Sequence, residues 1–165
     1  MPGERLDARW VRSWREQADA ALTKLMRSFL STHGFPPGLN AVMLASDDSH
    51  RATDALVDLT PVPSDLTTLY WVISEASLPD VDNGYFIHSP ATVAEHFHEY
   101  GPAPVDGESI ALVFAGDGGG RLFAIGDSGQ VWSSTTASWS DDFEVTASSL
   151  QEFLEQLGRR IVNQP

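Results

Sequence analysis

Cysteine is absent from the 165 residues of this chain. The absence excludes a disulfide framework, a thiolate zinc site and a cysteine nucleophile together. Long apolar runs are also missing, since no stretch approaches the roughly 18 residues that a membrane-spanning helix needs. The charged N-terminal segment lacks the apolar region of a signal peptide. We therefore expect a soluble, cytoplasmic protein.

Positive charge is scarce over most of the chain. The net charge is −13, and Arg121 is the only lysine or arginine between Ala52 and Gly158. A strongly acidic surface repels nucleic acid and anionic membranes and attracts basic proteins. Solubility alone would also account for the charge. The interpretation that carries function is a basic protein partner, with no nucleic acid and no membrane.

Glycine and aspartate interrupt the stretch from Ser109 to Ser133. The apolar runs at 110–115, 122–125 and 131–132 are separated by these turn residues, and the two longer runs have a strand length, so we predict three adjacent strands of a meander. The glycines also fit a phosphate-binding loop. A dinucleotide fingerprint, however, needs a further glycine where Arg121 stands, followed by a helix. A hairpin loop that uses glycine for positive φ is the better interpretation.

Helices are predicted where apolar residues recur at three- and four-residue spacings. The first spans Leu6 to Thr32 and carries two tryptophans in its apolar stripe, so it packs on the domain or, as the alternative, docks to another protein. The last begins at a capping box formed by Ser149 and Glu152. Ser64 and Ser89 are predicted N-caps of two internal helices. The three internal helices are expected at 52–59, 66–74 and 90–100.

The fold class follows from the order of these elements. Additional short strands are predicted at 40–46, 85–87 and 143–146. Strands therefore cluster in the middle with helices at both ends, which predicts an α+β fold with a central, mainly antiparallel sheet and helices on one side. The length suits one domain with a substantial core. We expect the sheet core, under the terminal helices, to contain Leu112, Phe114, Leu122, Phe123 and Ile125.

Several segments resemble the SUKH superfamily, the domains related to the Smi and Knr fungal cell-wall regulators. They are LP at 78–79, NGYFI at 83–87, AGDGGGRLFAI at 115–125, GQVW at 129–132 and ASSLQEFL at 147–154. The resemblance covers residues 64–157 and leaves out the first 60. The chain would then be a single SUKH-like domain over residues 1–165, with the helix at 6–32 as an extension.

The resemblance implies both a fold and a kind of function. It implies an α+β domain with an antiparallel sheet and, in bacteria, immunity proteins that bind and neutralise toxins, often nucleases. Fungal relatives resemble regulatory interaction proteins, so an intracellular regulatory or scaffold domain is the alternative. The family offers no shared catalytic residues. We accordingly expect no enzyme activity and no cofactor.

The histidines are the only metal candidates in the sequence. Glu95, His96, His98 and Glu99 crowd together, but on a helix the two histidines lie about 200° apart and only His98 shares a face with the glutamates. Without the HExxH spacing, a solvated helix face is the better interpretation. A hydrolase is equally weakly supported, since no Gly-x-Ser-x-Gly elbow is present. We predict no metal site and no catalytic residue.

Loop aromatics and acids are the best candidates for recognising a basic partner, because aromatic anchors supply binding energy and charges steer association. Trp132 has the right surroundings but is better explained as a core residue. The predicted partner-binding residues are Asp117, Asp127, Trp139, Asp141, Asp142 and Glu144.

Overall fold

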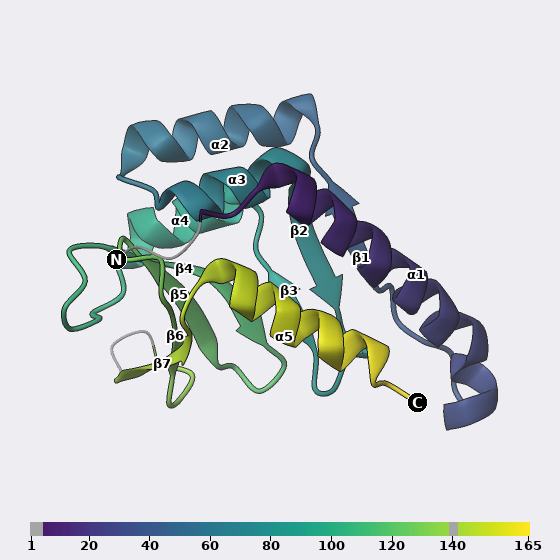
Figure 1. The fold of residues 1–165 in the computed structure, drawn as a ribbon. Coiled ribbons are helices and arrows are strands. Elements are labelled where there is room, and N and C mark those ends of the chain that lie inside the picture. The colour runs from purple at the N-terminus through teal and green to yellow at the C-terminus, as the bar shows by residue number, and fades with distance from the viewer. Residues whose placement is uncertain (1–4, 139–141) are drawn as a thin grey trace.

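The computed structural model describes residues 5–138 and 142–165. Within these residues the chain forms five helices and one seven-stranded sheet (Figure 1). Trp139 and Asp141 lie outside the described residues. The elements are α1 (Ala8–His33), β1 (Ala41–Leu44), α2 (Asp47–Leu59), α3 (Ser64–Val72), β2 (Ile73–Leu78), β3 (Tyr85–Ile87), α4 (Pro90–Tyr100), β4 (Ala111–Asp117), β5 (Leu122–Gly126), β6 (Val131–Ser134), β7 (Phe143–Ala147) and α5 (Leu150–Val162).

The strands follow one another across the sheet in the order in which they occur in the chain, β1 to β7. Each of the six neighbouring pairs is antiparallel. The predicted α+β class and the meander of β4, β5 and β6 are therefore confirmed. The glycine-rich segment forms the hairpin between β4 and β5, where Gly120 has a φ of +88°. A side chain rarely adopts this conformation, which accounts for a glycine at that position.

Local capping explains where several helices begin and end. The Asp7 carboxylate accepts a hydrogen bond from the Arg9 amide at 2.7 Å, and α1 ends at Gly34, which has a φ of +81°. The Ser89 hydroxyl oxygen accepts from the Thr92 amide at the start of α4, as predicted. Ser149 caps α5 in the same way through the Glu152 amide. Helices α1, α4 and α5 therefore each start from a side chain that replaces a missing backbone partner.

The Glu152 half of the predicted capping box is wrong. In an S-x-x-E box the glutamate reaches back to the N-cap backbone amide. Here the Glu152 carboxylate instead accepts a hydrogen bond from the Ser148 hydroxyl at 2.6 Å. The serine before the N-cap thus satisfies the carboxylate, and α5 keeps only the Ser149 half of the motif.

Two local predictions differ more from the structure. The helix expected at 66–74 ends at Val72, and Ile73–Leu78 forms the unpredicted strand β2, which pairs with β1 and β3. Ser64 is not an N-cap: Pro63 holds that position without a side-chain hydrogen bond. The neighbouring Asp65 carboxylate accepts instead from the Leu6 amide at 2.9 Å. A contact across the fold has therefore taken the place of a local cap.

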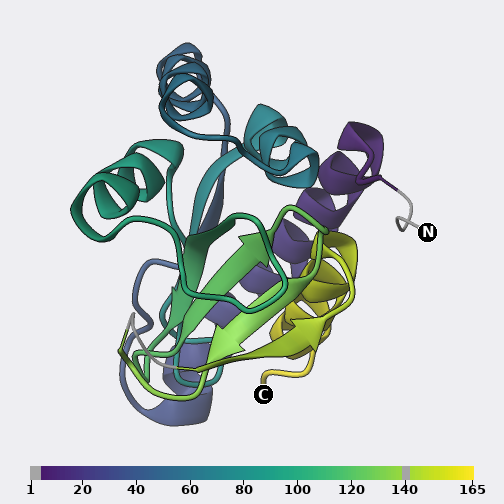
Figure 2. The same cartoon turned by 90° about the vertical axis from the view of Figure 1, so that its left-hand side faces the viewer.

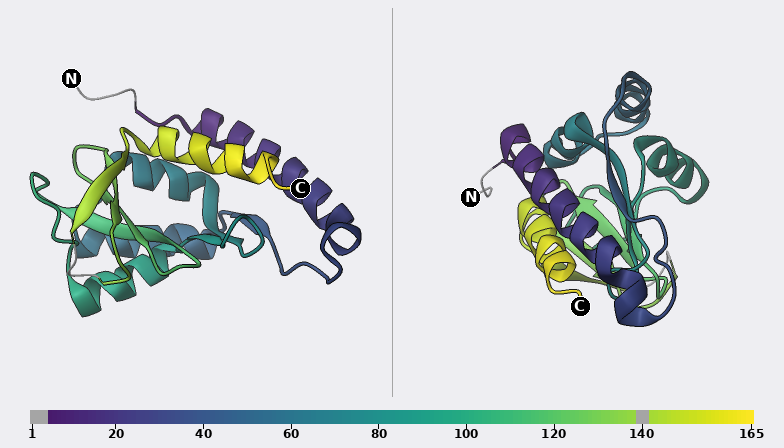
Figure 3. Two further views of the ribbon diagram at one scale, coloured as in Figure 1. Left: turned by 90° about the horizontal axis from the view of Figure 1, so that it is seen from below. Right: turned by 90° about the vertical axis from the view of Figure 1, so that its right-hand side faces the viewer.

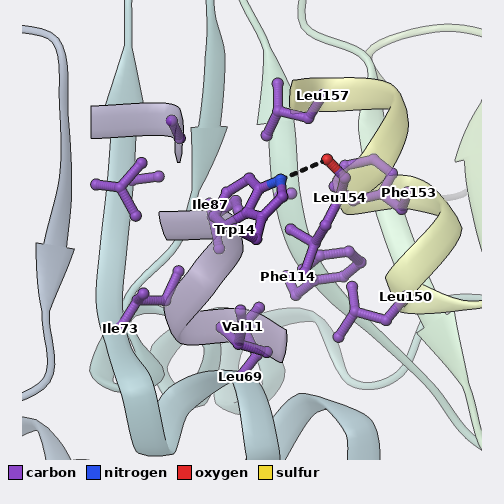
Figure 4. Packing of buried hydrophobic residues seen from close by; sticks show 14 of the residues in the cluster. Val11, Trp14, Leu69, Ile73, Ile87, Phe114, Leu150, Phe153, Leu154 and Leu157 are labelled. Atoms are coloured by element: carbon purple, nitrogen blue, oxygen red, sulfur yellow. Dashed lines mark hydrogen bonds between the residues drawn. The ribbon is translucent and has the colours of Figure 1, made fainter. Parts of the chain in front are cut away.

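The inner face of the sheet, defined as the face toward the helices, carries the larger hydrophobic core. Every helix contributes buried residues to it, including Leu56 from α2 and Val93 from α4. Figure 3 shows α1 and α5 lying side by side along the sheet. The buried Trp14 indole donates a hydrogen bond to the Leu154 carbonyl at 2.7 Å (Figure 4). The predicted packing of the tryptophan stripe on the domain is thus confirmed.

The outer face of the sheet carries a separate, smaller cluster. Its buried members are Ala103 and Val105 from the loop after α4 and three small side chains of β4 and β5, and this loop crosses the sheet (Figure 2). Leu122 packs against this cluster. The prediction that Leu122 lies under the terminal helices is wrong, because side chains alternate along β5 and Phe123 takes the inner face.

Candidate functional site

Of the predicted partner-binding residues within the described chain, Asp117, Asp142 and Glu144 lie at one end of the sheet. Asp117 ends β4 beside the start of β5, and the Leu122 amide donates to the Ser134 hydroxyl at the end of β6. Ser134 is in register with Phe143 at the start of β7. The hairpin between β4 and β5 and the loop between β6 and β7 therefore share one end.

Asp127 lies at the opposite end, in the turn between β5 and β6. Gly126 is in register with Ala111, the first residue of β4. The length of β5 separates the two ends by roughly 16 Å. The predicted acidic residues therefore form two separate groups, and a single small contact cannot use all of them.

Asp117 has a structural role in its hairpin. Its Oδ1 accepts hydrogen bonds from the Gly119 amide at 3.0 Å and the Arg121 amide at 2.9 Å. A side chain that caps its own turn in this way holds the loop in one conformation. The carboxylate is half-buried and its second oxygen has no protein donor among these bonds. Asp117 therefore shapes the end of the sheet and presents one oxygen there.

Within residues 5–138 and 142–165, the carboxylates of Asp142 and Glu144 have no comparable role. Both side chains are exposed, and Glu144 lies on β7, which is an edge strand. The backbone carbonyl of Asp142 accepts from the Thr135 amide at 3.1 Å and so closes the loop between β6 and β7. These two carboxylates are the predicted residues that are most accessible to a partner.

Asp127 ties two loops together on the outer face. Its Oδ1 accepts from the amides of Ser109 and Ile110 at 3.0 and 3.4 Å, and its Oδ2 accepts from the Ser109 hydroxyl. The Ser109 hydroxyl bond is the largest effect and lowers the pKa of Asp127; burial opposes it, and the backbone bonds lower the pKa further. The side chain is nevertheless exposed. It stays charged, and it is held in one position.

Glu108 is a second carboxylate at this end, and the sequence analysis missed it. Its Oε2 accepts from the Ser128 hydroxyl at 2.7 Å and from the Trp132 indole at 3.1 Å. A Cβ on Gly126 would lie only 1.3 Å from this oxygen, so the carboxylate rests directly on the glycine. The glycine inside a strand was the available signal, because it marks the close approach of another group.

Trp132 belongs to both the core and this acidic group. Its ring is half-buried and packs against the outer cluster, which agrees with the prediction of a core residue. Its indole nitrogen at the same time fixes the Glu108 carboxylate. The outer group, defined as Glu108, Asp127 and Trp132, is therefore an aromatic side chain beside two oriented carboxylates.

Four of the acidic side chains named above lack a cationic partner among the described residues. Within residues 5–138 and 142–165, the ion pairs are Arg15–Asp19, Arg51–Asp48 and Arg160–Asp82. None of them involves Glu108, Asp127, Asp142 or Glu144. Carboxylates that lack an internal cation keep their charge available to attract an external one.

The histidines form a pair that the sequence spacing did not indicate. The rings of His88 and His96 lie 5.3 Å apart between centroids. Burial, followed by the proximity of His96, lowers the pKa of His88 to about 4. In the described part of the chain, no three histidine or acidic side chains lie close enough to hold a metal ion. The pair is therefore described as a packing contact.

A groove runs along the outer side of α1 and α5. It encloses about 490 Å³ and is lined by Trp10, Ala18 and Val162, with Glu155 and Arg159 among its polar residues. Val162 is 68% exposed. The two helices approach closely here, since a Cβ on Gly158 would lie 3.1 Å from the Trp14 indole nitrogen. If the first helix docks to another protein, as the alternative prediction has it, this groove is where the contact would form.

None of the described helices combines the length and apolarity needed to cross a membrane. Comparison of the chain with protein-family models and with curated proteins gives no match.

Proposed function

We propose that this chain is a non-enzymatic protein-binding domain that captures a basic protein. The carboxylates that lack an internal cation carry this proposal, since Asp142 and Glu144 at one end, and Glu108 and Asp127 at the other, lack an ion pair within the described chain. Complementary charge raises the rate of encounter with a cationic partner and disfavours anionic ones. The same charges argue against a nucleic-acid partner.

The partner in this proposal is a toxin domain, such as a nuclease, and the chain is its immunity protein. Support comes from the resemblance of residues 64–157 to the SUKH superfamily and from the net charge of −13. A nuclease presents a basic surface to its polyanionic substrate, so an acidic protein can occupy that surface. An intracellular regulatory domain is the alternative, and it would need no toxin.

Co-expression with the product of a neighbouring toxin gene tests the immunity role. We expect the chain to protect a sensitive host and to form an isolable complex with the toxin domain. A host that remains as sensitive as with an empty vector, together with failure to isolate the complex, would favour the regulatory alternative.

Association kinetics test the role of charge. If steering dominates, raising the ionic strength should slow association by about one to two decades and change dissociation much less. Neutralising Asp142 and Glu144, alone or together with Asp141, should slow association in the same way. Truncation of Trp139 should instead speed dissociation if it anchors the complex.

A matched control is available on α2. Asp54 and Asp58 are exposed and lack an ion pair within the described residues, so their double asparagine variant removes the same charge from another surface. We expect it to slow association less than Asp142→Asn with Glu144→Gln. Equal effects would show that net charge, and not the end of the sheet, directs the encounter.

A further inference from the structure

Arg121, the one arginine of the cation-poor region between Ala52 and Gly158, lies beside Arg160 of α5. Arg121 and Arg160 both line a small cavity of about 50 Å³ between α5 and the sheet. Its walls include the aromatic rings of Tyr85, Phe123 and Phe153. No carboxylate lines it, although the chain as a whole has a net charge of −13. Two like charges that face one small space repel each other unless an anion lies between them.

The backbone of Arg121 is held in place by its hairpin. Its amide donates to the Asp117 carboxylate at 2.9 Å, and its carbonyl accepts from the Asp117 amide at 3.0 Å. Within residues 5–138 and 142–165, the Arg121 guanidinium has no ion-pair partner. The hairpin therefore delivers a cation to the cavity without an internal anion to neutralise it.

Arg160 is oriented from the opposite side. Its Nη1 donates to Asp82 at 2.9 Å, and its guanidinium carbon lies 5.5 Å from the centre of the Tyr85 ring. Gln164 donates to the other Asp82 oxygen at 2.8 Å and so fixes that carboxylate. A guanidinium has five N–H donors, and this pairing uses one of them. The remaining donors are available to a ligand.

Tyr85 lies close enough to both arginines, and to two carboxylates, for their charges to act on its hydroxyl. Burial raises the pKa of Tyr85 most. Arg160 lowers this pKa, Asp82 and Asp117 raise it, and Arg121 lowers it least. The Tyr85 hydroxyl, Thr146 and Gln156 add neutral hydrogen-bonding groups to the cavity wall. Two guanidinium groups with neutral hydrogen-bonding groups and aromatic walls match the chemistry of a carboxylate or a phosphate.

We propose that this cavity is an oxyanion-binding site in which Arg121 and Arg160 hold a carboxylate or phosphate group. Its volume is close to that of one or two waters, at roughly 30 Å³ each, so it admits one anionic group and not a whole ligand. A neighbouring cavity of about 330 Å³ shares Tyr85 and Arg160, and its lining includes the carboxylates of Asp82 and Asp117. The rest of the ligand extends there and is neutral or positively charged, because two carboxylates line that cavity. The site does not depend on the identity of the protein partner.

Titration of the full chain with inorganic phosphate and, separately, with succinate tests the site. Amide chemical shifts would be followed at constant ionic strength. Saturable shifts at Tyr85, Phe123 and Thr146 are expected. Saturation by phosphate alone assigns a phosphate ligand, saturation by succinate alone assigns a carboxylate, and saturation by both supports the shared oxyanion chemistry. Saturation by neither overturns the proposal.

Three variants make the test specific. Arg121→Gln should weaken affinity by about tenfold or more, because a charge-assisted hydrogen bond is lost. Arg121→Lys keeps the charge but loses the paired donors, so its affinity for the anion should lie between those of the wild type and Arg121→Gln. Arg159→Gln removes the same charge from the same helix, but Arg159 lines the groove between α1 and α5. An equal loss of affinity in Arg159→Gln would overturn the proposal.

Discussion

The two faces of the sheet are stabilised by different means. The inner face is covered by helices and buries large side chains such as Phe114 and Phe123. The outer face is covered by one loop, and its cluster consists mainly of alanine and valine. That loop is held by hydrogen bonds to the carboxylates of Glu108 and Asp127. Stability is thus concentrated on the inner face, and two oriented carboxylates hold the loop on the outer face.

The two faces should therefore differ in how substitutions and pH change the free energy of unfolding. Apolar burial depends on shape and volume, whereas bonds to ionisable groups also depend on pH. Substitutions on the inner face should therefore change the free energy of unfolding strongly at every pH. Substitutions on the outer face should have smaller effects, and the effect of removing the Asp127 carboxylate should shrink in acid.

The largest effect is expected at Phe123 on the inner face. Its ring lies 5.2 Å from that of Phe153 on α5, and only 5% of its surface is exposed. Phe123→Ala should cost about 3–5 kcal/mol in urea denaturation, because it opens a cavity in a packed core. Leu122→Ala, one residue away on the outer face, should cost about 1–2 kcal/mol, since this side chain is half-buried. Equal costs would contradict the distinction between the faces.

His88 should make the stability of the protein depend on pH. It follows the inward-facing Ile87, and its Nε2 would lie 3.9 Å from a Cβ on Gly116. Its folded pKa of about 4 lies below the usual 6.5, so the neutral form stabilises the fold above pH 6.5. This contribution is lost as the pH falls toward 4, when the unfolded chain gains the proton. It amounts to roughly 3 kcal/mol at most.

Urea denaturation of the wild type and of His88→Asn between pH 7 and pH 4 measures this contribution. In His88→Asn, the free energy of unfolding should decline much less below pH 6.5 than it does in the wild type. His98→Asn serves as the control, because His98 lies on α4 with an exposed side chain. A decline that persists unchanged in His88→Asn would assign it to other groups.

Gly126→Ala should disturb the attachment of the outer loop. The new Cβ would meet the Glu108 carboxylate, which must move and lose its bonds to Ser128 and Trp132. We expect a cost of about 1–3 kcal/mol. The cost of Gly126→Ala should be much smaller in a Glu108→Ala background, since the clash is then absent. A double-mutant cycle measures this coupling, and strict additivity would contradict the described contact.

The smallest effect is expected at Asp127. Its lowered pKa means that the charged form contributes stability above the usual value of 3.8, and that this contribution is lost as the pH falls through the folded value. Solvent screens an exposed carboxylate, so Asp127→Ala should cost about 1 kcal/mol or less at neutral pH. Comparing urea denaturation at pH 7 and pH 3 checks the sign, since the difference between wild type and variant should shrink in acid.

Periodic and capped elements could be predicted from the sequence because their signals are local. The first helix and the meander fall within two residues of their predicted limits. Strand β2 could not be predicted, since it continues directly from α3 and its burial depends on β1 and β3. The first residues of α2 were also missed, because its capping box joins Ser46 to Ser49 and not to a glutamate.

The candidate site was predictable only in part. Residue type and charge pointed to Asp117, Asp127, Asp142 and Glu144, but their division between two ends of the sheet follows from strand register. Glu108 escaped prediction because its partners lie 20 and 24 residues further along the chain. Hydrogen bonds between distant loops leave no local pattern in the sequence.

The contact between Trp14 and Leu154 has a consequence for biosynthesis. The two residues are separated by 140 positions, whereas each strand pairs with the strand next to it in the chain. The sheet can therefore assemble as the strands leave the ribosome, but α1 has no α5 to bind until the end. At about 5–20 residues per second, this delay is roughly 7–30 s. During that time the tryptophan stripe of α1 is available to chaperones and to nonspecific association.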